Sequence, residues 1–243
     1  MTAQALATVV KSRSMPGQRS SPKRERRRMK VKSLMQQYWD KIGADPKANW
    51  HIAHIDDDEA FFASGKKDIQ KIFNGKLDTL SSGSLVLDIG CGRGRLARAL
   101  AELRTDVRVV GVDVAPSMIQ SAILSNAHIK NASFCVGDGD SLAIFPDEVF
   151  DCAYSYIVFQ HLPRHVVGQY ISEAARVLKP GGKLIFQVQQ RDEPMMIDPV
   201  WNDFRTIRYY TNEQAVALAQ PPLSATKIRG KGHDLFIECQ KNS

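Results

Sequence analysis

Apolar residues from position 85 onward alternate between short continuous runs and helical spacing. The runs Leu85–Ile89 and Val107–Val112 are rich in large aliphatic residues, which indicates strands covered on both faces of a sheet. Between the two runs, Leu96, Leu100 and Leu103 recur three or four residues apart and predict an amphipathic helix. Strands that alternate with helices imply right-handed crossovers and a parallel sheet.

The same alternation continues toward the C-terminus. Met118 and its apolar neighbours predict a helix with Pro116 in its first turn. Strands follow at 134–136 and 149–154, and an apolar stripe predicts a helix from about Pro163 to Pro180.

The last two predicted strands, Leu223–Arg229 and His233–Cys239, are joined by only Gly230, Lys231 and Gly232. A connection this short permits a hairpin and no helical crossover. We therefore expect the final strand to run antiparallel to its neighbours.

The segment between the first strand and the first helix carries candidate chemistry. Gly90, Gly92 and Gly94 let the backbone turn sharply and come close to a ligand. Arg95 stands where the dinucleotide fingerprint has its third glycine, and Asp88 precedes the turn, which disfavours a diphosphate. A carboxylate there suits a cationic ligand such as S-adenosylmethionine, which carries an ammonium and a sulfonium group.

A second acid, Asp113, ends the next predicted strand, 23 residues after Gly90. Strand-end carboxylates at about this spacing accept the ribose hydroxyls in nucleoside-binding folds. The two motifs in succession indicate an adenosine site.

With these residues in view, the segment from about Leu85 to Cys239 resembles a class I S-adenosylmethionine-dependent methyltransferase of the small-molecule type. The further matches occur in the family's order: Asp113 to Met118, Gly137 to Asp140, Phe150 to Ser155, and Arg176 to Leu184.

The resemblance implies a Rossmann-like α/β sandwich of three layers, with a mostly parallel seven-stranded sheet, an antiparallel last strand and an N-terminal helical cap. It also implies that S-adenosylmethionine is bound and released as S-adenosylhomocysteine. The residues expected to bind the cofactor are Asp88, Gly90, Gly92, Asp113, Val114, Met118, Asp138, Gly139, Ser155 and Gln160.

The net charge of +7 comes from the N-terminal segment, because Lys11 to Lys32 holds ten basic residues and one acid, Glu25. We expect residues 1–32 to be a disordered basic tail, 33–80 a helical cap and 81–243 the methyltransferase domain. The rest of the chain carries no excess of basic residues, which argues against nucleic acid as the substrate. An RNA or protein methyltransferase that uses the tail is an alternative, as is a non-catalytic protein that binds the cofactor or a partner protein.

Aromatic residues mark the candidate acceptor site. Tyr38 and Trp50 belong to the expected cap, Tyr156 follows the fourth strand, and Trp201 lies in 191–212, which has the composition of a substrate lid. His161 follows the fourth strand and is a candidate base for a hydroxyl acceptor, because imidazole ordinarily titrates near neutral pH. A role for Gln160 and His161 in shaping the cofactor pocket is the alternative.

We therefore expect a methyltransferase that acts on a hydroxyl, or on an amine, of a small molecule. Four cysteines without a C-x-x-C pair predict a reduced, cytoplasmic chain with no metal site. No apolar run approaches the ~20 residues of a membrane helix. The sequence leaves the oligomeric state open.

Overall fold

Buried aliphatic residues assemble the strands into one sheet in a computed structural model, which describes residues 22–192, 204 and 206–242. The strands are β1 (Leu85–Ile89), β2 (Arg108–Asp113), β3 (Ala132–Val136), β4 (Phe150–Ser155), β5 (Leu178–Gln190), β6 (Tyr209–Tyr210), β7 (Leu223–Lys231) and β8 (Asp234–Lys241).

The sheet has the strand order β3-β2-β1-β4-β5-β8-β7, and the two-residue β6 pairs with the end of β5. Strands β1 to β5 pair in parallel, whereas β8 runs antiparallel to both β5 and β7. The predicted mostly parallel sheet and its antiparallel final strand are confirmed.

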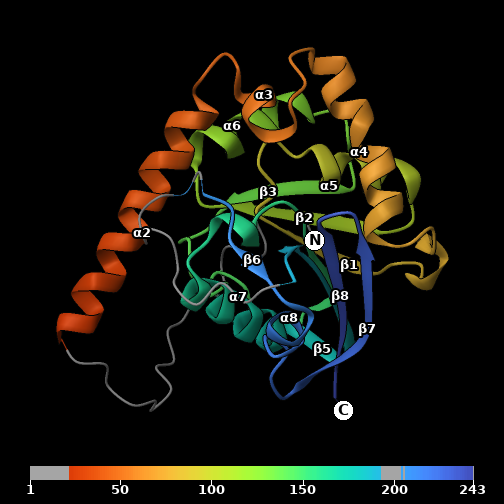
Figure 1. Ribbon diagram of the computed structural model, residues 1–243. Coiled ribbons are helices and arrows are strands. Elements are labelled where there is room, and N and C mark those ends of the chain that lie inside the picture. The colour runs from red at the N-terminus through yellow and green to blue at the C-terminus, as the bar shows by residue number, and fades with distance from the viewer. Residues whose placement is uncertain (1–21, 193–203, 205, 243) are drawn as a thin grey trace.

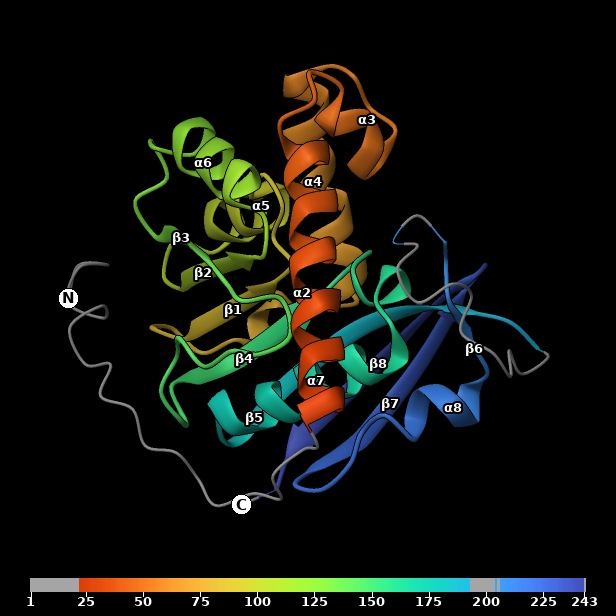
Figure 2. The same ribbon diagram turned by 90° about the vertical axis from the view of Figure 1, so that its left-hand side faces the viewer.

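Helices cover both faces of the sheet, as Figures 1 and 2 show. Buried residues of α4 and α5 pack on one face, and α7 and α8 pack on the other. The helical elements are α2 (Pro22–Gly43), α3 (Ala48–Ala53), α4 (Asp58–Ile72), η1 (Leu77–Thr79), α5 (Arg95–Leu103), α6 (Pro116–Ser125), η2 (Phe159–His161), α7 (Arg164–Val177) and α8 (Asn212–Val216).

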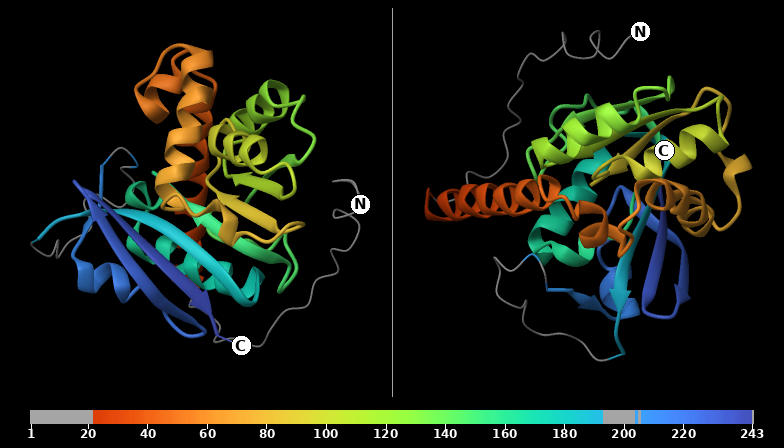
Figure 3. Two further views of the ribbon diagram at one scale, coloured as in Figure 1. Left: turned by 90° about the vertical axis from the view of Figure 1, so that its right-hand side faces the viewer. Right: turned by 90° about the horizontal axis from the view of Figure 1, so that it is seen from above.

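The basic N-terminal segment differs from its prediction. We expected no regular structure up to residue 32, but α2 begins at Pro22, and its first turns extend beyond the sheet (Figure 3). Proline favours the first helical position, and arginine, lysine, glutamate and methionine are good helix formers. Because the later turns of α2 pack on the body, the added turns need no new helix nucleus. The rest of the expected tail, residues 1–21, lies outside the described residues.

The helix before β5 also ends earlier than predicted. We expected it to reach Pro180, but α7 ends at Val177, because Leu178 already pairs with Phe150 of β4. A register shift between Phe150 and Cys152 then accommodates the Pro-Gly-Gly segment within β5.

Candidate active site

A cavity of about 970 Å³, counted with its open mouth, lies where β1, β2 and β4 end. This is the edge at which open α/β sheets bind ligands. Its walls are lined by Met35, Trp39, His51, Ile52, Phe61, Ile89, Gly90, Cys91, Gly92, Arg93, Arg95, Leu96, Asp113, Val114, Met118, Tyr156, Ile157, Val158, His161, Leu162 and Tyr170.

The glycine turn after β1 forms the floor of this cavity. Gly90, Gly92 and Gly94 all have positive φ angles, of 76°, 52° and 81°. A Cβ atom on Gly90 would lie 2.5 Å from Cγ2 of Val158, another lining residue. Only glycine therefore fits at this position, both in conformation and in space.

Asp113 at the end of β2 faces the same cavity. Its Oδ2 accepts a hydrogen bond from the Gly92 N–H (2.9 Å), and its Oδ1 accepts one from the Ala115 N–H (2.9 Å). Burial raises the pKa of this carboxyl, while the backbone N–H groups of Ala115, Gly92 and Val114 lower it in part. Each oxygen retains lone-pair capacity for a further donor, as a ribose diol would require.

Asp88, by contrast, does not line the cavity. Along β1 the side chains alternate, so Asp88 points to the opposite face from Leu87 and Ile89. There it is 1% exposed. Strand alternation turns the Asp88 side chain toward the layer of α5, and its predicted role in cofactor binding stays a prediction.

The surroundings of Asp88 favour its protonated form. Burial raises its pKa to about 7, the nearby Tyr154 hydroxyl and Arg95 guanidinium offset this in part, and Asp113 adds to it. An acid with a raised pKa in the folded state holds a proton that the unfolded chain has already released.

Asp88 should therefore make the free energy of unfolding fall as pH rises from about 4, the model-compound pKa, to about 7. We expect Asp88→Asn to remove this fall and to be more stable than wild type at pH 8 by on the order of 2 kcal/mol. Urea unfolding at pH 4, 6 and 8 measures the effect, with the exposed Glu59→Gln as control. Parallel pH profiles for wild type and Asp88→Asn would contradict the assignment.

Arg93 connects the glycine turn to the helices above it. Its Nη1 donates to Oδ1 of Asp58 (2.9 Å) and to the side-chain oxygen of Asn49, and its Nε donates to Oγ of Ser121 (2.8 Å). Arg93 thus links the glycine turn to three helices: α3, the start of α4, and α6.

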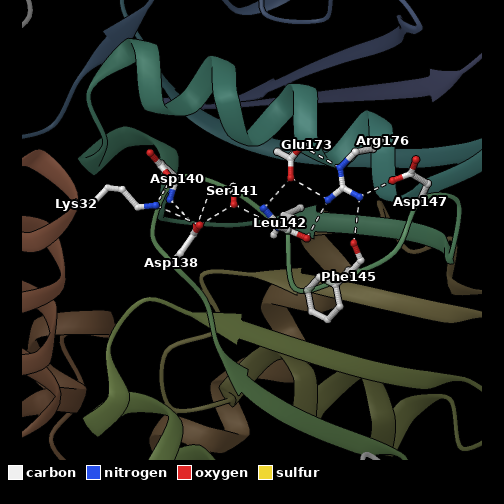
Figure 4. Close-up of polar contacts among 10 residues, drawn as sticks. Lys32, Asp138, Asp140, Ser141, Leu142, Phe145, Asp147, Glu173 and Arg176 are labelled. Atoms are coloured by element: carbon white, nitrogen blue, oxygen red, sulfur yellow. Dashed lines mark hydrogen bonds and ion pairs between the residues drawn. The ribbon is translucent and has the colours of Figure 1, made fainter. Parts of the chain in front are cut away.

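The loop after β3 holds Asp138, another acid that the sequence predicts in the cofactor site (Figure 4). Asp138 accepts hydrogen bonds from the N–H (2.8 Å) and hydroxyl (2.7 Å) of Ser141. Lys32 of α2 forms ion pairs with Asp138 (3.1 Å) and Asp140 (2.6 Å).

The turn that follows is fixed to α7. Glu173 accepts a hydrogen bond from the Leu142 N–H (3.0 Å), and Arg176 donates to the carbonyls of Leu142 and Phe145 (both 3.0 Å; Figure 4). The whole loop is thereby held between α2 and α7.

Asp138 and Gly139 therefore lie behind the cavity wall. A Cβ atom on Gly139 would meet Cγ2 of Val114 at 2.7 Å and Cε of Met35 at 2.8 Å, and both of those residues line the cavity. Met35 and Lys32 of α2 lie over this loop, and the predicted cofactor contacts of Asp138 and Gly139 stay predictions.

Two further expected cofactor residues support the wall without lining it. The Ser155 hydroxyl donates to the Ile89 carbonyl (3.0 Å) and ties β4 to β1 beside the glycine turn. Gln160 is buried among other glutamines. Gly90, Gly92, Asp113, Val114 and Met118 are the expected cofactor residues that do line the cavity.

In α2 and in α3, the residue that lines the cavity is the one that follows the predicted aromatic residue. Tyr38 packs on Phe204, with ring centroids 5.8 Å apart, while its neighbour Trp39 lines the cavity. Trp50 is 46% exposed, while His51 lines the cavity. One step along a helix rotates a side chain by about 100°, so the neighbour takes the inward position.

Of the other predicted acceptor residues, Tyr156 lines the cavity, and Trp201 lies outside the described residues, as does most of the expected lid. The cavity also uses Met35 and Trp39, which sequence reasoning missed. Their spacing of four residues on α2 was the available signal.

His161 lines the cavity, but its environment differs from the expectation of an ordinary imidazole. Burial lowers its pKa to about 4, with a further lowering from the Arg208 guanidinium and a smaller opposing effect of the Phe204 backbone. The ring is therefore neutral at physiological pH, and its affinity for a proton is low.

Within residues 22–192, 204 and 206–242, no group of three or more His, Cys, Asp or Glu residues is arranged to hold a metal ion. None of the described helices combines the length and apolar character needed to cross a membrane.

Sequence comparison relates this site to known proteins. A family profile described as "Methyltransferase domain" matches residues 86–182. The 2-methyl-6-phytyl-1,4-hydroquinone methyltransferase of Synechocystis is 38% identical over 120 residues, which cover 49% of this chain and 36% of the relative. The demethylmenaquinone methyltransferase of Tropheryma whipplei is 34% identical over 110 residues, 45% of this chain and 44% of the relative. The chain thus spans less than half the length of these curated relatives.

Comparison with solved structures gives the same fold. The magnesium protoporphyrin IX methyltransferase of Synechocystis, solved with S-adenosylhomocysteine, matches with a TM-score of 0.62 and 16% identity, over 87% of this chain and 100% of that chain. A methyltransferase from Methanosarcina mazei matches with a TM-score of 0.57 and 22% identity, over 68% of this chain and 95% of that chain.

Proposed function

This chain belongs to the class I S-adenosylmethionine-dependent methyltransferases, and on that premise we propose that it transfers the cofactor's methyl group to a hydroxyl of a small, largely apolar molecule. The observation that carries the proposal is the joint placement of the glycine turn and Asp113 on one cavity at the sheet edge. An amine is the second acceptor group that we consider.

The cofactor site that we propose combines a backbone cradle with one carboxylate. Gly90 and Gly92 leave the space that a side chain would fill, and Asp113 offers oxygen atoms to the two ribose hydroxyls. Val114 and Met118 supply apolar contacts for the adenine ring. These residues fit S-adenosylmethionine in shape and in charge.

When bound, the cofactor supplies a methyl group on a sulfonium, which is already a good leaving group. The residues of this chain then have to align the acceptor with that methyl group and exclude water. Alignment of this kind contributes about 7–11 kcal/mol to catalysis. Trp39 and Phe61 suit this task, because both reach the cavity from the N-terminal helices.

The acceptor that we propose is an aromatic ring with a hydroxyl, such as a hydroquinone or another phenol. Leu162, Tyr156 and Trp39 give the cavity a wall that suits a flat apolar ring. The names of two relatives, a phytyl hydroquinone methyltransferase and a ubiquinone biosynthesis O-methyltransferase of Xanthomonas oryzae (32% identical over 111 residues), support this acceptor class.

A panel experiment tests the proposal. We expect calorimetry to detect S-adenosylmethionine binding, and mass spectrometry to detect methylation of at least one hydroquinone or catechol. Deletion of residues 1–21 should leave this transfer unchanged. Cofactor binding without transfer to any small molecule would refute the proposal, and methylation of RNA or protein that depends on residues 1–21 would replace it with the macromolecular alternative.

A further inference from the structure

A buried network of amide side chains joins a salt bridge to the cavity wall. The bridge is formed by Lys71 of α4 and Asp234 of β8, whose side chains are 28% and 19% exposed. The network reaches the cavity wall at two residues, Tyr156 and His161. The connecting residues are Gln160, Gln187 and Gln189.

The orientation of the Gln187 amide is fixed at both ends. Its Nε2 lies 2.9 Å from Oδ1 of Asp234, and an ionised carboxylate only accepts hydrogen bonds. Its Oε1 accepts the Ile157 N–H (3.0 Å), and a backbone N–H only donates. The nitrogen of Gln187 must therefore face Asp234.

The same reasoning fixes the next two amides. Nε2 of Gln189 lies 2.8 Å from Oδ1 of Asp234 and must also be a donor. Both of these donors reach one atom of Gln160, at 3.1 Å from Gln187 and 3.2 Å from Gln189. That atom has to be the oxygen, so the NH₂ group of Gln160 points the other way.

The NH₂ group of Gln160 faces Nε2 of His161 at 3.1 Å. A donor there requires a lone pair on Nε2, which places the proton of the neutral ring on Nδ1. The low pKa of His161 keeps the ring neutral. The ring also packs edge-on against Trp39, with centroids 5.7 Å apart, and the charged group that acts on it is the Arg208 guanidinium.

We propose that Asp234, acting through Gln187, Gln189 and Gln160, fixes His161 as its Nδ1–H tautomer, so that neither ring nitrogen has a free lone pair with which to take the acceptor's proton. The statement about the acceptor rests on the proposed function, whereas the tautomer does not. Asp234 and Gln160 are positioning residues in this scheme.

Tyr156 completes the wall as a hydrogen-bond donor. The Lys71 ammonium donates to its hydroxyl oxygen (3.2 Å), and an ammonium group cannot accept. The Tyr156 oxygen therefore acts as acceptor toward Lys71, and its own proton is available to another partner. A donor on the cavity wall stabilises an oxyanion of the acceptor.

The acceptor class follows from this arrangement. The acceptor hydroxyl releases its proton to water before transfer. A lone pair of the resulting oxyanion then forms the O–CH₃ bond while the C–S bond breaks. The electron pair of the C–S bond stays on sulfur, which becomes a neutral thioether. A phenol or enol ionises readily enough for this route, whereas an aliphatic alcohol does not.

Nitrogen NMR of the full chain labelled at its histidines tests the tautomer without any acceptor. We expect the His161 signals to show a protonated Nδ1 and an unprotonated Nε2 from pH 6 to 8, with the other histidines as internal references. Gln160→Glu should move the proton to Nε2, because a carboxylate only accepts. Gln70→Glu, the same change at an exposed position, should leave His161 unaltered. An Nε2–H signal in wild type, or no change in Gln160→Glu, would overturn the proposal.

Kinetics with phenols of different acidity tests the acceptor class. The pH midpoint of kcat/KM should move with the pKa of the phenol. A midpoint that is the same for every phenol indicates a protein base and would overturn this part. If no phenol is methylated, the proposed function fails, while the tautomer is still decided by the NMR spectrum.

Discussion

Replacing Asp113 with alanine should weaken S-adenosylmethionine binding by at least ~100-fold. Hydrogen bonds to a charged group each contribute about 1.5–3 kcal/mol, and each 1.4 kcal/mol corresponds to about a tenfold change in Kd. The variant loses the proposed contacts to both ribose hydroxyls and the acceptor of the Gly92 and Ala115 N–H groups. Calorimetric titration with the cofactor measures the effect.

Two control variants accompany this experiment. Asp113→Asn keeps the shape of the side chain and one acceptor oxygen, so its affinity should fall between those of wild type and the alanine variant. Asp138→Asn should bind nearly as well as wild type, because Asp138 lies behind the cavity wall and contacts Ser141 and Lys32. Unchanged affinity in a folded Asp113→Ala, or an equal loss in Asp138→Asn, would contradict the proposed site.

Gly94→Ala should lower the free energy of unfolding by about 2–4 kcal/mol. Part of the loss is backbone strain, because φ is +81° at this position. The rest is overpacking, since the new Cβ would lie 2.7 Å from the Phe134 ring and 2.8 Å from Nδ2 of Asn126. Urea unfolding measures the loss.

Gly83 provides a matched control for this change. It has the same φ of +81°, but nothing lies within 4 Å of a Cβ placed there. Gly83→Ala should therefore lose only the strain contribution, about 1 kcal/mol. Adding Phe134→Leu to Gly94→Ala should restore part of the stability. If both variants lost the same free energy of unfolding, the contact with Phe134 would contribute nothing to the loss in Gly94→Ala.

The sheet and the glycine turn could be predicted because their signals are local. Buried strands such as β1 appear as continuous apolar runs, and the short connection between β7 and β8 allows only a hairpin.

Other features depend on how elements meet, which a single sequence does not report. The direction in which Asp88 points depends on which face of the sheet each side chain of β1 occupies. The choice of Trp39 over Tyr38 follows from the rotation of α2 against the sheet. The pairing of Lys71 with Asp234 joins residues 163 positions apart, and no motif in either segment indicates it.

This long-range pairing has a consequence for the protein during its synthesis. The glycine turn, Asp113 and Met118 leave the ribosome well before Asp234, because they precede it by more than a hundred residues. A nascent chain can therefore contain the proposed cofactor cradle before the amide network has its carboxylate. The carboxylate that aligns the amides lies in β8, so the proposed tautomer of His161 can be fixed only after Asp234 has been synthesised.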